Sequence, residues 1–148
     1  MKLKQLQPSP DLGLLLTRLM LAVVFVFHGS QKLFGAFGGY GIEGTAGFFE
    51  QIGMPFPTAS VVLAGGTELF GGLALALGLF ARPAALGLAG TMFVAALSAH
   101  TGFNGQTGGM EYPLTLAVLS VALAVSGPGR FALRSTPAVD VAPHPVTA

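Results

Sequence analysis

Residues 61–80 read VVLAGGTELFGGLALALGLF, and this stretch decides the fold. It holds one ionisable residue, Glu68, in an apolar run long enough to cross the roughly 30 Å hydrocarbon core of a bilayer. Similar apolar blocks cover residues 12–27, 84–99 and 113–126. The sequence therefore predicts an all-α fold, a bundle of four transmembrane helices at about 12–34, 58–80, 82–100 and 111–126.

The composition of the whole chain also indicates a membrane protein whose main partner is the lipid bilayer. Of its 148 residues, 52% are hydrophobic and 9% are charged, whereas soluble domains carry about 25% charged residues. The net charge of +1 gives no reason to expect nucleic-acid binding. We therefore predict one membrane domain over residues 1–134. Residues 135–148, which are rich in proline and have no apolar periodicity, are expected to form a disordered tail.

Two further features of the chain limit its chemistry and processing. The chain contains no cysteine, which excludes disulfides, thiolate nucleophiles and cysteine-held iron–sulfur clusters. Any redox role would then depend on a bound cofactor, a quinone or a partner. The first apolar block is interpreted as a helix and not as a cleaved signal peptide, because Arg18 interrupts it and no small-x-small cleavage site follows.

The basic residues predict the orientation of the bundle in the membrane. Five of them fall at the same predicted end: Lys2, Lys4, Arg82, Arg130 and Arg134. Because basic residues concentrate on the cytoplasmic side, this pattern places both termini in the cytoplasm. We expect a multi-pass protein of the cell membrane whose first loop faces outward.

That first loop contains a short segment with its own periodicity. Phe48, Phe49 and Ile52 recur at helical spacing within residues 43–52. The pattern predicts a short amphipathic helix lying at the outer membrane interface. An irregular glycine-rich loop is the alternative.

Arg18 and Glu68 are ionisable residues inside apolar blocks, where charged side chains usually face the bundle interior. The neighbours of Glu68 on its helix face are all small: Ala64, Gly65, Gly71 and Gly72. Counting 1.5 Å per residue from the predicted helix ends places the two charges within about 6 Å of each other in depth. We therefore expect a buried Arg18–Glu68 ion pair, which either only fixes the helix register or belongs to a functional polar path.

A second group of polar residues gathers at the predicted outer helix ends. Its candidates for catalysis or proton transfer are His28, Lys32, His100 and Glu111, and its candidates for ligand binding are Gln31, Asn104 and Tyr112. His28 and Lys32 share a helix face, and we expect His28 to point toward His100 and Glu111. A neutral histidine both donates and accepts hydrogen bonds and titrates near physiological pH. The group therefore suits a proton relay or a site for a quinone-like ring.

Other interpretations of this group remain open. Polar residues at helix ends can simply solvate the interface. Metal binding is disfavoured because HxH, HxxxH and HExxH spacings are absent and Lys32 adds a positive charge, so no metal ligand is predicted. Ser30 and Ser98 lie near histidines, but no GxSxG motif supports nucleophilic catalysis.

Four segments follow one another in an order typical of a known family. They are LLTRLMLAVVFVFHGSQKLFG (15–35), GIEGTAGFFEQIGMPFP (41–57), VLAGGTELFGGLALALGLFARPAALGLAG (62–90), and HTGFNGQTGGMEYPLTL (100–116) with SGPGRFAL (126–133). Over about residues 14–133 the chain resembles the DoxX family. The resemblance implies a small four-helix membrane protein with cytoplasmic termini. The family's characteristic positions fall here on Arg18, His28, Gly29, Lys32, Glu68, Gly71, Gly72, Arg82, Glu111, Tyr112, Gly127, Pro128, Gly129 and Arg130.

The resemblance implies a redox-associated protein without fixing its substrate. Some members form the membrane subunit of a thiosulfate:quinone oxidoreductase, and others associate with a superoxide dismutase and a sulfurtransferase. We expect an oxidoreductase subunit, with a quinone as candidate cofactor, a soluble or membrane redox protein as candidate partner, and self-association as a further expectation. The alternatives are a non-enzymatic scaffold that docks a partner through its first loop, which includes residues 43–52, and its lipid-facing helices, and a small transporter. The absence of an evident inverted repeat disfavours the transporter.

Overall fold

The computed structural model describes residues 9–133, and residues 1–8 and 134–148 lie outside the described part. The tail predicted at 135–148 is therefore outside the described residues. Within residues 9–133 every long element is an α-helix, and the predicted all-α fold is confirmed. The elements in chain order are α1 (Pro10–Phe34), η1 (Ala36–Gly38), α2 (Gly41–Gln51), α3 (Pro57–Leu77), α4 (Ala81–Ser98), η2 (Gly105–Thr107) and α5 (Glu111–Ser126), where η marks a 3-10 turn.

The long helices have the dimensions and surface of membrane helices. α1, α3 and α4 are long and apolar enough to cross a membrane, and α5 is a shorter apolar helix. With its 16 residues, α5 rises about 24 Å. The outward faces carry exposed apolar side chains that a bilayer would cover, among them Leu16, Val23, Leu63 and Leu97. The molecule is thus a four-helix membrane bundle.

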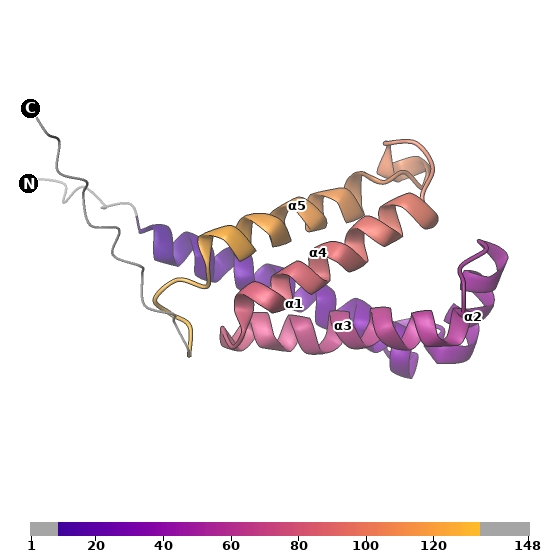
Figure 1. Cartoon of the computed structure of the whole chain (residues 1–148), viewed down its shortest axis with the longest axis horizontal. Coiled ribbons are helices and arrows are strands. Elements are labelled where there is room, and N and C mark those ends of the chain that lie inside the picture. The colour runs from indigo at the N-terminus through magenta and orange to yellow at the C-terminus, as the bar shows by residue number, and fades with distance from the viewer. Residues whose placement is uncertain (1–8, 134–148) are drawn as a thin grey trace, which may run out of the picture.

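The bundle has two ends of different character (Figure 1). We call the end where α1 begins and α5 finishes the proximal end, and it also holds the turn between α3 and α4. The opposite, distal end holds η1, α2 and η2. α3 and α4 diverge from their shared turn toward the distal end, as Figure 1 shows.

Local signals in the sequence fix where the helices begin and end. The Ser9 side chain accepts a hydrogen bond from the backbone N–H of Leu12 and Pro10 takes the first helical position, so α1 starts there. Gly78, in the left-handed conformation with φ of 71°, ends α3 at Leu77, earlier than the predicted boundary at residue 80.

The tightest packing joins α1 to α3 and α4 to α5. A Cβ placed on Gly29 would lie 2.6 Å from the backbone N of Leu69, and one on Gly72 would lie 3.1 Å from the carbonyl oxygen of Ala22. Only residues without a side chain allow the two backbones to come this close. These contacts fix the register of α1 against α3 and so decide which side chains can meet.

The apolar core lies where the two helix pairs meet. Its largest side chains are Leu21, Phe25, Leu75, Leu88, Leu116 and Leu123, drawn from α1, α3, α4 and α5. α3 and α4 are in contact at Gly71, where a Cβ would lie 3.0 Å from Cγ of Leu88. Beyond that contact the two helices separate, and a cavity lies between the pairs.

Candidate functional site

A cavity of about 580 Å³ lies between the two helix pairs in the distal half of the bundle. α1, α3, α4 and α5 form its walls, and α2 with the loop that follows it covers the distal side. Most of the lining is apolar. The polar side chains in it are His28, Lys32, Ser60, Thr67, Glu68, Thr91, Ser98, His100 and Tyr112.

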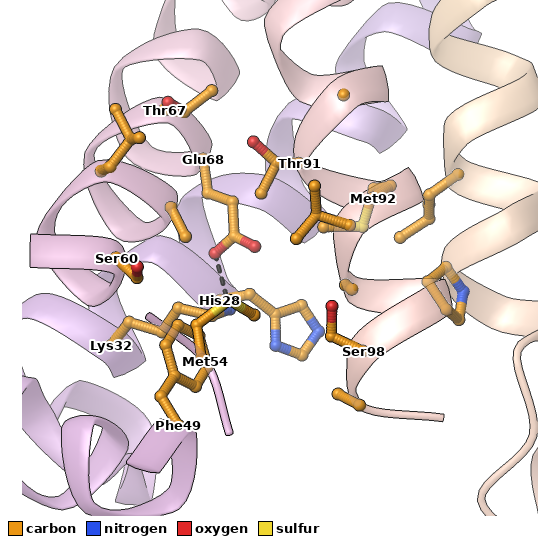
Figure 2. A pocket seen from close by; sticks show the side chains of 18 of the residues that line it. His28, Lys32, Phe49, Met54, Ser60, Thr67, Glu68, Thr91, Met92 and Ser98 are labelled. Atoms are coloured by element: carbon orange, nitrogen blue, oxygen red, sulfur yellow. Dashed lines mark hydrogen bonds and ion pairs between the residues drawn. The ribbon is translucent and has the colours of Figure 1, made fainter. Parts of the chain in front are cut away.

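The strongest interaction in the cavity joins Lys32 of α1 to Glu68 of α3. Lys32 Nζ donates to Glu68 Oε2 at 2.7 Å, a short charge-assisted hydrogen bond (Figure 2). The side chain of Glu68 is 1% exposed and that of Lys32 is 24% exposed. Lys32 reaches Glu68 past Gly65, which has no side chain to block it: a Cβ on Gly65 would lie 3.2 Å from Cβ of Lys32. The glycine therefore makes room for the pair.

The predicted ion pair between Arg18 and Glu68 is wrong, because the helix register places the two residues at different depths. Gly78 and not Glu68 lies beside Arg18, since a Cβ on Gly78 would be 2.7 Å from Nη1 of Arg18. Ten residues of helix separate Gly78 from Glu68, a rise of about 15 Å. Depths counted from predicted helix ends cannot reveal this offset, because α1 and α3 differ in length and their ends are not level.

Arg18 instead forms hydrogen bonds to the backbone of the segment that follows α5. Nη1 donates to the carbonyl oxygen of Pro128 at 2.9 Å and Nη2 donates to that of Phe131 at 3.0 Å. The guanidinium is buried, and its Nε has no hydrogen-bond partner among the residues that the structure describes. It lies near the carboxyl end of α3 at Gly78, where the helix dipole favours a positive charge. Arg18 is thus a structural residue of the proximal end, away from the cavity.

His28 projects into the cavity between the Lys32–Glu68 pair and Ser98 of α4, as Figure 2 shows. Gln31 lies behind it: the amide Nε2 of Gln31 donates to the carbonyl oxygen of Phe37 at 3.4 Å, and its Oε1 lies 3.1 Å from Nδ1 of His28. An amide oxygen only accepts, so Nδ1 carries the proton when the ring is neutral. Nε2 of His28 is then left to accept a hydrogen bond inside the cavity.

Two other predicted residues also line the cavity. His100, just beyond α4, has Nδ1 2.8 Å from the carbonyl oxygen of Ala95, so that nitrogen donates. The ring of Tyr112, at the start of α5, is in edge contact with that of His28 at a centroid distance of 6.2 Å. His28, Lys32, His100 and Tyr112 therefore meet around one space, although they come from three parts of the chain.

The remaining predicted residues lie elsewhere. Glu111 borders a separate depression with Phe103 and Leu114, so the expectation that His28 points toward Glu111 is wrong. The side-chain oxygen of Asn104 accepts from the backbone N–H of Gln106 at 3.0 Å and begins η2. Gln31 supports His28 without lining the cavity. Among residues 9–133, no group of three or more His, Asp or Glu side chains lies close enough to hold a metal ion.

Several lining residues were not predicted as part of the site. Phe48, Phe49, Ile52 and Met54 cover the distal side, although the spacing of the first three indicates a helix at the membrane interface. Their apolar face was visible in the sequence, but which surface it would cover was not. Thr67 and Thr91 line the cavity from α3 and α4. An isolated threonine in an apolar block carries no signal by itself.

Comparison with known proteins places the chain in a family. The family model described as DoxX matches residues 13–101. The chain is 29% identical over 126 residues to a protein of Escherichia coli (strain K12) named "Inner membrane protein YqjF". This alignment covers 83% of this chain and 90% of that protein. It is 34% identical over 123 residues to a Bacillus subtilis (strain 168) protein named "Putative oxidoreductase CatD", covering 80% and 82%. No solved structure matches the chain.

The matched region runs from the first turn of α1 to the end of α4 and so includes both residues of the Lys32–Glu68 pair. The family model therefore covers more than half of the chain, and the two relatives align with most of it. The chain belongs to the DoxX family of membrane proteins.

Proposed function

We propose that this protein is the membrane subunit of a redox assembly and binds a small lipid-soluble molecule with a quinone-like ring in the cavity. The observation that carries the proposal is the cavity itself. Its volume of about 580 Å³ falls within the roughly 300–1,000 Å³ of small-molecule sites, and its apolar lining has a few convergent polar groups. The printed name of the Bacillus subtilis relative, "Putative oxidoreductase CatD", agrees with a redox role.

The polar groups match the needs of a ring with two carbonyl oxygens. Lys32 has two further hydrogen-bond donors, because its ammonium has three N–H groups and Glu68 accepts from one of them. Tyr112 and Ser98 add hydroxyl donors around the same space, whereas the hydroxyl of Thr91 donates to the carbonyl oxygen of Gly87 at 3.1 Å. A quinone would supply two-electron chemistry that also consumes protons. Lys32, Glu68 and His28 can hold and exchange protons beside it, while the electrons would come from a partner protein.

The same proposal includes a location and an orientation. We place the protein in the cell membrane with the proximal end in the cytoplasm. Arg82 and Arg130 lie at that end, whereas Lys32, at the distal end, is paired with Glu68. Lys2, Lys4 and Arg134, which support the same orientation in the sequence, lie outside the described residues. A redox partner, and self-association, belong to the proposal as well.

The direct test is binding of a quinone to the purified protein in bilayer nanodiscs. A ligand present at about a hundredfold above its Kd should stabilise the folded protein by about 2.7 kcal/mol. A His28→Phe variant removes the acceptor Nε2, and we expect it to weaken binding by about tenfold. Glu111→Gln is the matched control, because Glu111 lies outside the cavity and its replacement should leave binding unchanged.

The outcomes separate the proposed function from its alternative. Stabilisation of the wild-type protein that is reduced in His28→Phe and kept in Glu111→Gln supports a ligand site. A wild-type protein that no quinone stabilises would contradict the proposal and leave the non-enzymatic scaffold.

A further inference from the structure

We propose that the ligand reaches the cavity from within the bilayer, through an opening between α3 and α4 at Gly87 and Gly90, and that its apolar tail stays in that opening. The inference rests on the proposed function and adds the class of ligand. The ligand would have a polar head and a long apolar tail, and would be dissolved in the membrane.

The line of contact between α3 and α4, which we call the seam, widens toward the distal end over a few residues. A Cβ on Gly71 would lie 3.0 Å from Cγ of Leu88, so the helices are packed there. One on Gly87 would lie 3.4 Å from Cγ2 of Thr67, an ordinary contact. On Gly90, one turn further toward the distal end, a Cβ would meet nothing within 4 Å. The seam is therefore closed on the proximal side of Gly87 and open at Gly90, and both glycines line the cavity.

The opening faces the side of the bundle that lipid would cover. Leu63 of α3 and Val94 of α4, which line the same cavity, are 73% and 51% exposed. Large apolar side chains so exposed on a membrane-spanning segment are in contact with acyl chains. On the distal side, by contrast, Phe49 and Met54 lie over the cavity, as Figure 2 shows.

The distribution of polar groups fixes how a ligand would lie. Glu68 is buried and its carboxylate points into the cavity, with Lys32 and His28 beside it (Figure 2). At the rim, Gly87, Gly90 and Val94 carry no polar side-chain atom, and Thr67 presents its methyl carbon Cγ2 toward Gly87. The hydroxyl of Thr91 uses its hydrogen in a bond to the carbonyl oxygen of Gly87 at 3.1 Å. A polar head is therefore stabilised inside, and a tail that remains in the opening keeps its contact with the acyl chains. A molecule without a tail would gain nothing from the opening.

The test compares two probes in Gly90→Leu. The probes are a benzoquinone without a tail and the same benzoquinone with a decyl tail, and the measurement is their Kd for the full chain in nanodiscs. Leucine at position 90 would fill the opening and leave the head site intact, and it is a better helix former than glycine. Gly13→Leu is the matched control, because Gly13 is also exposed, also has nothing within 4 Å of a Cβ, and lies at the proximal end of α1.

We expect Gly90→Leu to weaken binding of the tailed quinone by about tenfold or more while binding of the tailless quinone stays at the wild-type value. Gly13→Leu should bind both probes as the wild-type protein does. The proposed opening is wrong if Gly90→Leu binds the tailed quinone as well as the wild-type protein, or loses both probes equally. A wild-type protein that binds neither probe overturns the proposed function itself.

Discussion

At the scale of single residues, the pair of Lys32 and Glu68 is the buried charged contact between α1 and α3. A carboxylate that is 1% exposed is tolerated in an apolar bundle because an ammonium donates to it at 2.7 Å. Removing either partner leaves a buried charge without compensation. Under the proposed function, the pair would lie beside the polar head of a bound ligand, because both side chains line the cavity.

We therefore predict that Lys32→Met and Glu68→Leu each destabilise the protein by roughly 3 kcal/mol, in the lower part of the range for broken buried pairs because Lys32 is 24% exposed. The double variant should lose less than the sum of the two, since no charge is then left unpaired. Unfolding by denaturing detergent, followed by circular dichroism, measures these differences. Additive losses would show that the two side chains act independently.

Arg18 supports a second prediction at this scale. Because it donates to the carbonyl oxygens of Pro128 and Phe131, exchanging its charge with that of Glu68 should not restore stability. We expect Arg18→Glu, Glu68→Arg and the double variant all to be strongly destabilised, by about 3 kcal/mol or more. The same unfolding measurement applies, with Arg130→Gln as an exposed control. Recovery in the double variant would contradict the contacts described for Arg18.

At the scale of elements, the helices could be predicted from the sequence but their mutual register could not. Apolar blocks and capping residues such as Ser9 and Gly78 are local signals, so they locate helices along the chain. The pairing of Lys32 with Glu68 depends on the close packing of Gly29 against Gly65 and Leu69. This contact joins segments that are far apart in the chain. The sequence could show that Glu68 faces protein, since its neighbours are small, but not which basic residue lies level with it.

The α1–α3 contact is tested by adding one methyl group. Gly29→Ala places a Cβ 2.6 Å from the backbone N of Leu69, which forces the helices apart and should cost about 1–3 kcal/mol. Alanine is the better helix former by about 1 kcal/mol, so a loose contact would give the opposite sign. Gly13→Ala, where nothing lies within 4 Å, is the control and should be neutral or stabilising. Thermal unfolding of both variants decides between the two outcomes.

At the scale of the whole molecule, composition alone decides the class of protein. With 9% charged residues the chain cannot cover a soluble surface, and the exposed apolar faces of the helices bear this out. The candidate site was predicted in part. His28, Lys32, His100 and Tyr112 do share one cavity, whereas Glu111 does not. Glu111 and Tyr112 are successive residues of α5, so their side chains leave the helix about 100° apart and only one of them faces the cavity. The sequence does not show how α5 is rotated about its axis relative to the other helices.

The proposed orientation is also a property of the whole molecule. Because the chain has no cysteine, a single introduced cysteine is a unique label. Thr107→Cys, in the distal turn η2, should react with a membrane-impermeant maleimide on intact protoplasts. Leu133→Cys, exposed at the proximal end, should react only after the membrane is opened. The reverse pattern of labelling would place the proximal end outside.

The shortness of α5 has a consequence for the surrounding lipid. A helix that rises about 24 Å is shorter than a hydrocarbon core of roughly 30 Å, whereas α1, with 25 residues, rises about 37 Å. Bilayers adjust to such a mismatch by thinning beside the short segment. The annulus of lipid around this protein is then uneven, thinner along α5 and either thicker along α1 or crossed there by a tilted helix. No bilayer of uniform thickness matches both helices, so the protein would impose a thickness gradient on the lipid between its two sides.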